Sequence, residues 1–353
     1  PNVVVAAGKA WDEDAWDTIT IGTMTFDAVK PCARCVVTTT DQATGARDAD
    51  QEPLRTLATF RTIPRLGAIF VPLNWRLSPA ELKYLLDDAE PRLLFGDEGA
   101  AEAGFDGEPI DGLAETVAGL PVDMACAADP DRPSLILYTS GTTGKPKGVI
   151  HLHKDLVYAV ETWGQHVVEF TSEDRAFCSS KLYFSYGLNF AMYLPLYYGA
   201  SVILNPDRPL PETILSMIEK YRPTGLFSVP TSYGQQLNYI EAAENKSDLS
   251  SLRFCVSAGE ALPGSLLRRW RAIFGIDILD GLGSSEVSLI FICNRPGKVR
   301  ENASGLPLPG YTIEVRDELG NTLPANELGD LWVKSNTLFH AYWKNPEKTA
   351  GTL

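Results

Sequence analysis

The chain has 353 residues, 44% of them hydrophobic, and a formal net charge of −14. This length allows one large domain or two ordinary ones, and the acidic balance argues against nucleic acid, whose phosphates are bound by clustered cations. No apolar run approaches the roughly 20 residues that span a bilayer, so we expect no membrane partner. Six cysteines in a chain of this length favour a reducing compartment, and we expect a cytoplasmic protein.

Residues 1–63 have the pattern of short strands. Alternating apolar residues and Gly turns, as in Ile19-Thr-Ile-Gly22, are typical of such strands. Cys32 and Cys35 form a CxxC pair, but no second Cys or His pair stands nearby to complete a four-ligand zinc site. The β-branched residues after Cys35 indicate a strand, whereas a redox CxxC prefers a helix start. Spacing alone therefore favours two partly buried thiols.

This first segment resembles the carboxy-terminal part of MOSC-domain proteins, a molybdenum-cofactor family that includes amidoxime reductases. The resemblance implies that the residue matching Cys35 coordinates molybdenum. Because it covers only the tail of such a domain, without most of the β-barrel and cofactor pocket, we do not expect the molybdenum cofactor to bind. At residues 63–65 the pattern changes, and a gene fusion, a frameshift and an assembly artefact all stay open as explanations.

From Arg65 onward strand and helix patterns alternate. A helix is predicted at residues 79–89 and a strand at 92–95, before a connector at 97–130 that is rich in Gly, Ala, Asp and Glu. Further helices are predicted at 155–168, 211–221, 233–243 and 263–274, and strands at 135–138, 200–204, 225–229 and 252–256. Residues 311–315 and 329–334 indicate a β-rich subdomain. The alternation predicts an α/β fold with mainly parallel sheets flanked by helices.

A loop follows the apolar strand that ends at Tyr138. It reads Thr139-Ser-Gly-Thr-Thr-Gly-Lys-Pro-Lys-Gly148, and its backbone N–H groups, hydroxyls and two lysines suit phosphate oxygens. Pro146 follows Gly144-Lys145, so the Gly-Lys-Ser/Thr ending of a Walker A loop is absent. A flexible, solvated turn is the alternative, and the preceding strand, the hydroxyls and both lysines together argue against it.

This loop resembles the phosphate-binding loop of the adenylate-forming superfamily of acyl- and aryl-CoA ligases. The resemblance implies that the loop holds the β- and γ-phosphates of ATP, that its first residue takes part in catalysis, and that Lys147 is a supporting cation, whereas Lys145 is expected to be solvated. The implied phosphate ligands are Thr139, Ser140, Gly141, Thr142, Thr143 and Gly144.

The segment Lys181-Leu-Tyr-Phe-Ser-Tyr-Gly-Leu-Asn189 resembles the acyl-pocket motif of benzoate-type ligases. The resemblance implies that the Tyr186 ring packs on the substrate ring, with Ser185 and Gly187 beside it. A flat aromatic wall suits an aryl acid. The neighbouring Tyr183 and Phe184 are expected to be core aromatics.

Two more segments follow predicted strands. Ser257-Ala-Gly-Glu260 resembles the family's adenine-contacting segment, although a simple strand-to-helix turn is the alternative. Asp280-Gly-Leu-Gly-Ser-Ser-Glu286 resembles the Tyr-Gly-x-Thr-Glu element, which implies Ser285 at the α-phosphate and Glu286 on Mg²⁺. A helix cap is the alternative role for Glu286. The remaining implied nucleotide contacts are Ala258, Gly259, Glu260, Asp280, Gly281, Gly283 and Ser284.

One position departs from the benzoate-type pattern. Leu289 stands where such ligases often carry a His near the acyl site, so a different or less polar acid is open and benzoate is the leading candidate. His151 and His153 follow the phosphate loop without a nucleophile, and His151 is expected to be a local packing or surface residue.

The resemblance predicts two domains: a MOSC-like fragment at residues 1–63 and part of a ligase AMP-binding domain at 64–353. It implies ATP-dependent, AMP-forming activation of an aromatic carboxylate such as benzoate to an acyl adenylate and then an acyl-CoA, with ATP, Mg²⁺ and CoA. The family's first segment, its Thr-Gly-Asp element and its lid domain have no counterpart, so weak or no activity is expected. A molybdenum oxidoreductase module and a non-catalytic nucleotide-binding fragment are the alternatives, and the oligomeric state is open.

Overall fold

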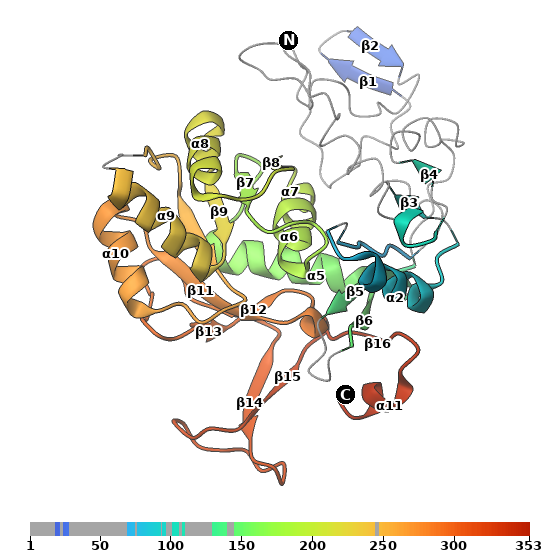
Figure 1. Ribbon diagram of the computed structural model, residues 1–353. Helices are drawn as coiled ribbons and strands as arrows, with labels where there is room; N and C mark the ends of the chain where they lie inside the picture. The colour runs from blue at the N-terminus through green and yellow to red at the C-terminus, as the bar shows by residue number, and fades with distance from the viewer. Residues whose placement is uncertain are drawn as a thin grey trace. The chain divides into compact units, whose positions relative to one another are not determined.

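The structure is a computed structural model with two compact units, Pro1–Gly148 and Val149–Leu353 (Figure 1). It describes residues 18–21, 24–27, 69–74, 76–92, 94–96, 101–105, 108–109, 129–139, 145–243 and 247–353. Cys35, the predicted boundary at residues 63–64 and the loop residues Ser140–Gly144 lie outside these ranges, so those expectations stay predictions.

The first unit contains α2 (Pro79–Ala89), which begins with a reciprocal cap. The Ser78 hydroxyl accepts the Glu81 N–H, and the Glu81 carboxylate accepts the Ser78 N–H. The helix is confirmed at the predicted residues, and its apolar face packs Leu82 and Leu86 against Ala103. The described strands of this unit are β1 (Thr18–Ile21) antiparallel to β2 (Met24–Asp27), β3 (Phe95–Gly96) parallel to β4 (Glu108–Pro109), and β5 (Pro133–Thr139).

The second unit is built on a seven-stranded sheet in the order β13-β12-β11-β10-β9-β7-β8. The strands β7 (Arg175–Cys178), β8 (Ser201–Ile203), β9 (Gly225–Ser228), β10 (Phe254–Ser257) and β11 (Ile278–Gly283) are parallel, as predicted. The strands β12 (Ile290–Cys293) and β13 (Leu306–Pro307) are added antiparallel. The five parallel strands therefore end at one shared edge, where open α/β sheets bind ligands.

Helices cover both faces of this sheet (Figure 1). The helices α8 (Pro211–Tyr221), α9 (Pro230–Ala243) and α10 (Gly264–Phe274) bury Ile214, Leu237 and Trp270 against one face. On the other face, Trp163 and Phe190 pack on Phe227. These two come from α5 (His153–Trp163) and the run η3 (Gly164–Val168), α6 (Ser185–Leu188), η4 (Asn189–Tyr193) and α7 (Leu194–Tyr197).

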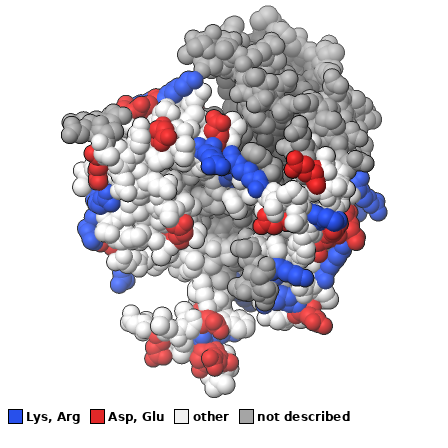
Figure 2. Space-filling view, in the orientation of Figure 1, with Lys and Arg blue, Asp and Glu red and all other residues white. Residues whose placement is uncertain are grey.

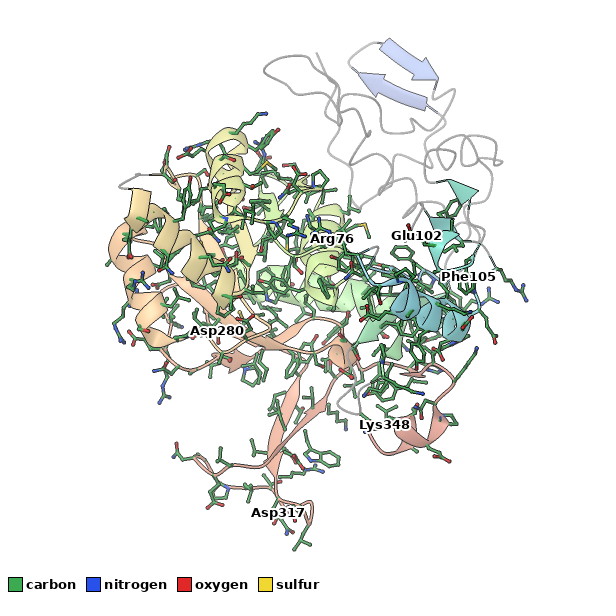
Figure 3. All side chains as sticks on the ribbon, viewed as in Figure 1. Arg76, Glu102, Phe105, Asp280, Asp317 and Lys348 are labelled. Carbon is green, nitrogen blue, oxygen red and sulfur yellow. The ribbon has the colours of Figure 1, made fainter. Side chains whose placement is uncertain are left out.

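The carboxy-terminal part is β-rich, as predicted. The strands β14 (Thr312–Arg316) and β15 (Asp330–Lys334) form an antiparallel ribbon, which carries acidic side chains in Figure 2 and Asp317 near its end in Figure 3. The short β16 (Ala341–Tyr342) pairs with β6 (Lys147–Leu152) through Tyr342 and Val149, and α11 (Pro346–Ala350) follows. Within the described ranges, no helix is both long and apolar enough to cross a membrane.

Candidate functional site

The turn after β11 reverses the chain into β12 and carries three of the predicted site residues. Ser284 is exposed, and Ser285 and Glu286 are half-buried in the short 3₁₀ helix η5 (Ser285–Val287). The pairing of β11 with β12 shifts between Leu282 and Gly283. A Cβ at Gly283 would lie 2.8 Å from the Leu289 carbonyl oxygen, so only glycine allows the two strands to approach this closely.

Ser288 completes this turn in a strained conformation. Its φ is 70° and its ψ is −46°, and the Leu289 N–H donates to the Val287 carbonyl over 2.9 Å, which defines a γ-turn. The Ser288 carbonyl accepts from the Ser185 hydroxyl at 2.7 Å and from Asn189 Nδ2 at 2.8 Å. The segment from Lys181 to Asn189, called the acyl motif here after its resemblance, is thus tied directly to the turn that carries Glu286, and Leu289 lies buried beside them in the core.

Glu286 is held from a second side by the segment before and within β16. The Tyr342 hydroxyl donates to Glu286 Oε1 over 2.9 Å, and the Phe339 N–H donates to the Glu286 carbonyl over 2.7 Å. The Glu286 carboxylate therefore bonds to a side chain 56 residues away. The Glu286 side chain does not cap a helix, which was the alternative role considered for it.

His151 holds the same turn from β6. It is fully buried, its Nε2 lies 2.6 Å from the Ser285 carbonyl oxygen, and its Nδ1 faces Asp155 at 3.3 Å. A carbonyl only accepts, so Nε2 carries the hydrogen of that contact. The expectation of a surface residue is wrong, and besides its local contact with Asp155 the side chain has a partner 134 residues along the chain.

The chemistry of these donors fits Mg²⁺ better than a metal that needs an all-protein cage. In the part of the chain that the structure describes, no three His, Cys, Asp or Glu side chains gather as a metal site. Glu286 offers a single carboxylate. Mg²⁺ commonly takes one or two carboxylates and completes its shell with waters and substrate phosphates.

The acyl motif lies at the start of α6. The Tyr186 hydroxyl faces the carbonyls of Ser228 at 3.2 Å and Val256 at 3.1 Å, and its ring meets Phe190 edge-on at 5.0 Å. Burial raises the pKa of Tyr186 well above its ordinary value, so the hydroxyl stays a donor. A Cβ at Gly187 would lie 2.1 Å from the Lys181 carbonyl oxygen, so Gly187 serves backbone approach.

Phe184 corrects the expectation of a core aromatic. Its side chain is 54% exposed, and Tyr183 beside it is only half-buried. Phe184 is the residue that caps α6, in extended conformation with φ −99° and ψ 143°. Its side chain therefore projects away from the helix, and Leu188 and Phe190 take the core positions.

Asp280 lies near the end of β11, where it is labelled in Figure 3. It is only 7% exposed, its Oδ2 accepts from the Ser304 hydroxyl at 3.1 Å, and Oδ1 has no hydrogen bond from the described residues. Burial raises the pKa of Asp280 to about 6, against the lowering effect of the Ser304 hydroxyl. The next residue, Gly281, is buried against Ile290 of β12.

The predicted adenine segment leaves β10 as a turn. Ala258 is buried, Gly259 has a φ of +87°, and Glu260 is exposed. The Glu260 carboxylate accepts from the Thr231 hydroxyl at 3.1 Å and from the Thr231 N–H at 3.2 Å, at the first turn of α9. Turn geometry is therefore present here, and a contact with adenine stays a prediction.

The described ends of the phosphate loop belong to the first unit. Thr139 is the half-buried last residue of β5, and Lys147 is the half-buried first residue of β6. Lys145 is exposed, as expected, with its Nζ 5.9 Å from the centre of the Tyr84 ring.

Three residues whose side chains bond to the Glu286 turn were not among the predicted site residues: His151, Asn189 and Tyr342. Asn189 closes the acyl motif, and His151 stands four residues before Asp155, so each had a local signal in the sequence. Tyr342 had none, because its partner is far away along the chain.

A parallel α/β sheet with a Gly-rich turn at the carboxyl ends of its strands has the architecture of a ligand-binding α/β protein. The chain belongs to the AMP-binding enzyme family, whose model matches residues 53–343. The MOSC domain model matches residues 1–83.

The relatives agree with this assignment. The chain is 36% identical over 314 residues to a benzoate–CoA ligase of Thauera aromatica, covering 84% of this chain and 59% of that protein. It is 34% identical to a 4-hydroxybenzoate–CoA/benzoate–CoA ligase of Rhodopseudomonas palustris, covering 82% of this chain and 57% of that protein. The chain therefore spans less than two thirds of the length of these relatives.

Solved structures give the same result. A benzoate CoA ligase from Burkholderia xenovorans LB400 superposes with a TM-score of 0.78 at 32% identity, covering 84% of this chain and 62% of that chain. An anthranilate CoA ligase in complex with anthranoyl-AMP superposes with a TM-score of 0.77 at 35% identity, covering 83% of this chain and 59% of that chain. The predicted adenylate-forming fold is thus confirmed.

Proposed function

We propose that this protein serves the ATP-dependent activation of an aromatic carboxylate, with benzoate as the leading candidate. In the first step a carboxylate oxygen bonds to the α-phosphorus of ATP and the bond to pyrophosphate breaks. In the second step the CoA thiol attacks the acyl carbon and AMP leaves. We further propose that residues 1–63 and 64–353 form separate regions, and that the second carries this function.

The observation that carries the proposal is the 2.7 Å hydrogen bond from Ser185 to the Ser288 carbonyl. It joins the acyl motif to the Glu286 turn at one edge of the sheet. A carboxylate held beside Tyr186 would lie near Ser285 and Glu286. Such proximity lowers the barrier of a reaction between two bound anions, because the encounter is organised in advance.

The remaining roles follow from charge. A carboxylate approaching a phosphate needs cations and oriented donors. We assign Glu286 to hold Mg²⁺, which when bound would offset charge on the phosphates. Ser285 and Thr139 would donate to phosphate oxygens, as would the loop from Ser140 to Gly144 with Lys147 in support. The nucleoside would contact the segments Ala258–Glu260 and Asp280–Ser284.

The substrate ring is proposed to be apolar. Gly187 and Leu289 bring no polar side chain to the acyl motif, and Leu289 is only 4% exposed. A ring hydroxyl near Leu289 would lose its water without gaining a partner, which penalises hydroxybenzoates.

Isothermal titration of the 353-residue chain with benzoyl-sulfamoyl adenosine, a stable mimic of benzoyl adenylate, tests the proposal. We expect saturable binding that weakens at least tenfold when the benzoyl group is absent, since acyl and nucleotide contacts act together. Weaker binding of the 4-hydroxybenzoyl analogue would support an apolar ring pocket. Absence of heat with every analogue would contradict the proposal.

The MOSC match at residues 1–83 favours a second candidate, a molybdenum-cofactor module with Cys35 as ligand. Elemental analysis of the purified chain, with a Cys35→Ser control, separates the two. Stoichiometric molybdenum that disappears in the Cys35→Ser variant would support the second candidate, and a molybdenum-free chain would reject it.

A further inference from the structure

Tyr342 is fixed in place by contacts that do not involve its hydroxyl. Its residue pairs with Val149 across β16 and β6, and its N–H donates to the Thr349 hydroxyl over 3.0 Å. Its ring packs against Phe339 with centroids 4.6 Å apart, and only 4% of the residue is exposed. These contacts hold the ring in a position from which its hydroxyl reaches Glu286 Oε1.

The same segment fixes the main chain of Glu286. The Phe339 N–H holds the Glu286 carbonyl, and His151 holds the preceding carbonyl of Ser285. With its main chain held, Glu286 keeps only side-chain rotations. The 2.9 Å bond from Tyr342 restricts these rotations by engaging Oε1, and Oε2 receives no hydrogen bond from the described residues.

We infer that Tyr342 is a positioning residue that orients the Glu286 carboxylate so that Oε2 faces the metal of a metal–nucleotide complex. The inference rests on the metal role of Glu286 in the proposed function. Partners that orient a metal-binding carboxylate typically change metal affinity by roughly 10- to 100-fold when removed. Tyr342 would therefore set how tightly the metal is held without touching it.

The hydroxyl remains protonated over the useful pH range. Burial, and then the hydrogen bond to Glu286, raises the pKa of Tyr342 to about 12. The Tyr342 hydroxyl therefore donates to Glu286 throughout neutral pH, and no titration of this group is needed for its role.

The test compares Tyr342→Phe with the parent 353-residue chain. Mn²⁺ affinity in the presence of saturating ATP is measured by electron paramagnetic resonance, and ATP affinity without metal by isothermal titration. We expect Mn²⁺ to bind at least about tenfold more weakly to the variant. Metal-free ATP affinity should stay unchanged, which a merely structural loss of the fold would not allow.

Tyr233→Phe is the matched control. Tyr233 is also fully buried, and its hydroxyl faces the Leu226 and Val256 carbonyls away from Glu286. It should alter unfolding but not Mn²⁺ affinity. A second variant, Thr349→Val, removes the acceptor of the Tyr342 N–H and keeps the hydroxyl, so a smaller loss of Mn²⁺ affinity is expected.

The outcomes separate the inference from the proposed function. If the parent binds Mn²⁺ with ATP and Tyr342→Phe binds it equally well, the inference is overturned and the metal role of Glu286 survives. If Glu286→Gln also binds Mn²⁺ like the parent, or the parent binds none, the proposed metal role of Glu286 falls and the inference falls with it.

Discussion

The middle of the parallel sheet and its carboxyl edge are built from the same strands but differ in chemistry. In the middle, Leu226, Phe227, Val256 and Leu279 are buried and apolar. One step further along, the residues are polar yet still buried: Ser179, Ser228, Ser257 and Asp280. They form a row, because Ser228 pairs with Ser257, Ser257 pairs with Asp280, and the Ser179 and Ser228 hydroxyls lie 2.7 Å apart.

The difference shows that one part of the sheet stabilises the fold and another part offers polar groups to a ligand. Burying apolar groups stabilises the fold, whereas burying hydroxyls and a carboxylate costs free energy unless partners are supplied. Asp280 Oδ1 and Ser257 Oγ have no hydrogen bond from the described residues. The carboxyl edge therefore keeps hydrogen-bonding atoms that the fold itself does not use and that a bound ligand can satisfy.

The largest effect should come from the middle layer. Trp270 is fully buried and packs against Tyr233 and Phe274. Trp270→Ala should lower the free energy of unfolding by about 3–5 kcal/mol, because it leaves a large cavity. Urea denaturation measures this loss.

Phe190→Ala should lower the free energy of unfolding by a similar amount. Because the Phe190 ring contacts Tyr186, this variant should also bind the benzoyl-adenylate mimic more weakly, whereas Trp270→Ala should not. Equal losses of binding in the two variants would contradict the distinction between the middle of the sheet and its edge.

Asp280→Asn tests how much free energy of unfolding the protein loses by burying a charged carboxylate at the carboxyl edge of the sheet. The folded pKa of Asp280 is raised to about 6 from 3.8, so its charged form is disfavoured in the folded state. Below pH 3.8 the Asp280 carboxyl is protonated in both the folded and the unfolded state, so it does not change the stability of the parent. The parent loses stability as the pH rises from 3.8 to about 6, and the loss stays constant at higher pH. The variant should therefore gain on the parent between pH 4 and 7, by up to about 3 kcal/mol.

Urea midpoints of both proteins at pH 4.5 and 8 measure this gain. Asp248→Asn is the control, because the Ser250 hydroxyl and Arg222 lower the pKa of Asp248 to about 2, and its difference from the parent should be flat over this range. A flat difference for Asp280→Asn as well would show that Asp280 is not penalised by burial.

The smallest effect is expected at the link between the acyl motif and the turn. Ser185→Ala removes one of two donors to the Ser288 carbonyl, while Asn189 remains. We expect a loss of about 1 kcal/mol in unfolding free energy, and binding of the benzoyl-adenylate mimic a few-fold weaker. Ser216→Ala, which removes a local bond within α8, should leave binding unchanged, and an identical result for Ser185→Ala would contradict the link.

Much of this architecture could be predicted because its signals are local. The bounds of α8 match the prediction, since Pro211 stands at its start, Ile214, Leu215 and Ile218 share a face, and Lys220 lies in its last turn. The alternation of strands and helices predicted the parallel sheet. The Gly-rich turn with Glu286 was identified by its resemblance to the family's Tyr-Gly-x-Thr-Glu element.

The rest depends on contacts that no local pattern records. The helical run from Ser185 to Tyr197 was not predicted, because much of it is buried and it has no clear polar face. The contacts of Tyr342 and His151 with the turn follow from strand register, which the sequence does not state. Phe184 was predicted wrongly because an aromatic cluster does not show which ring lies outside a helix start.

The γ-turn at Ser288 has a consequence for how the molecule opens. Its strained backbone is stabilised by Ser185 and Asn189, so the turn and α6 should loosen together as one cooperative unit. The Leu289 amide is bonded inside this turn. The hydrogen–deuterium exchange rate of that single amide therefore reports how often the acyl motif opens, and a ligand bound at the site should lower this rate.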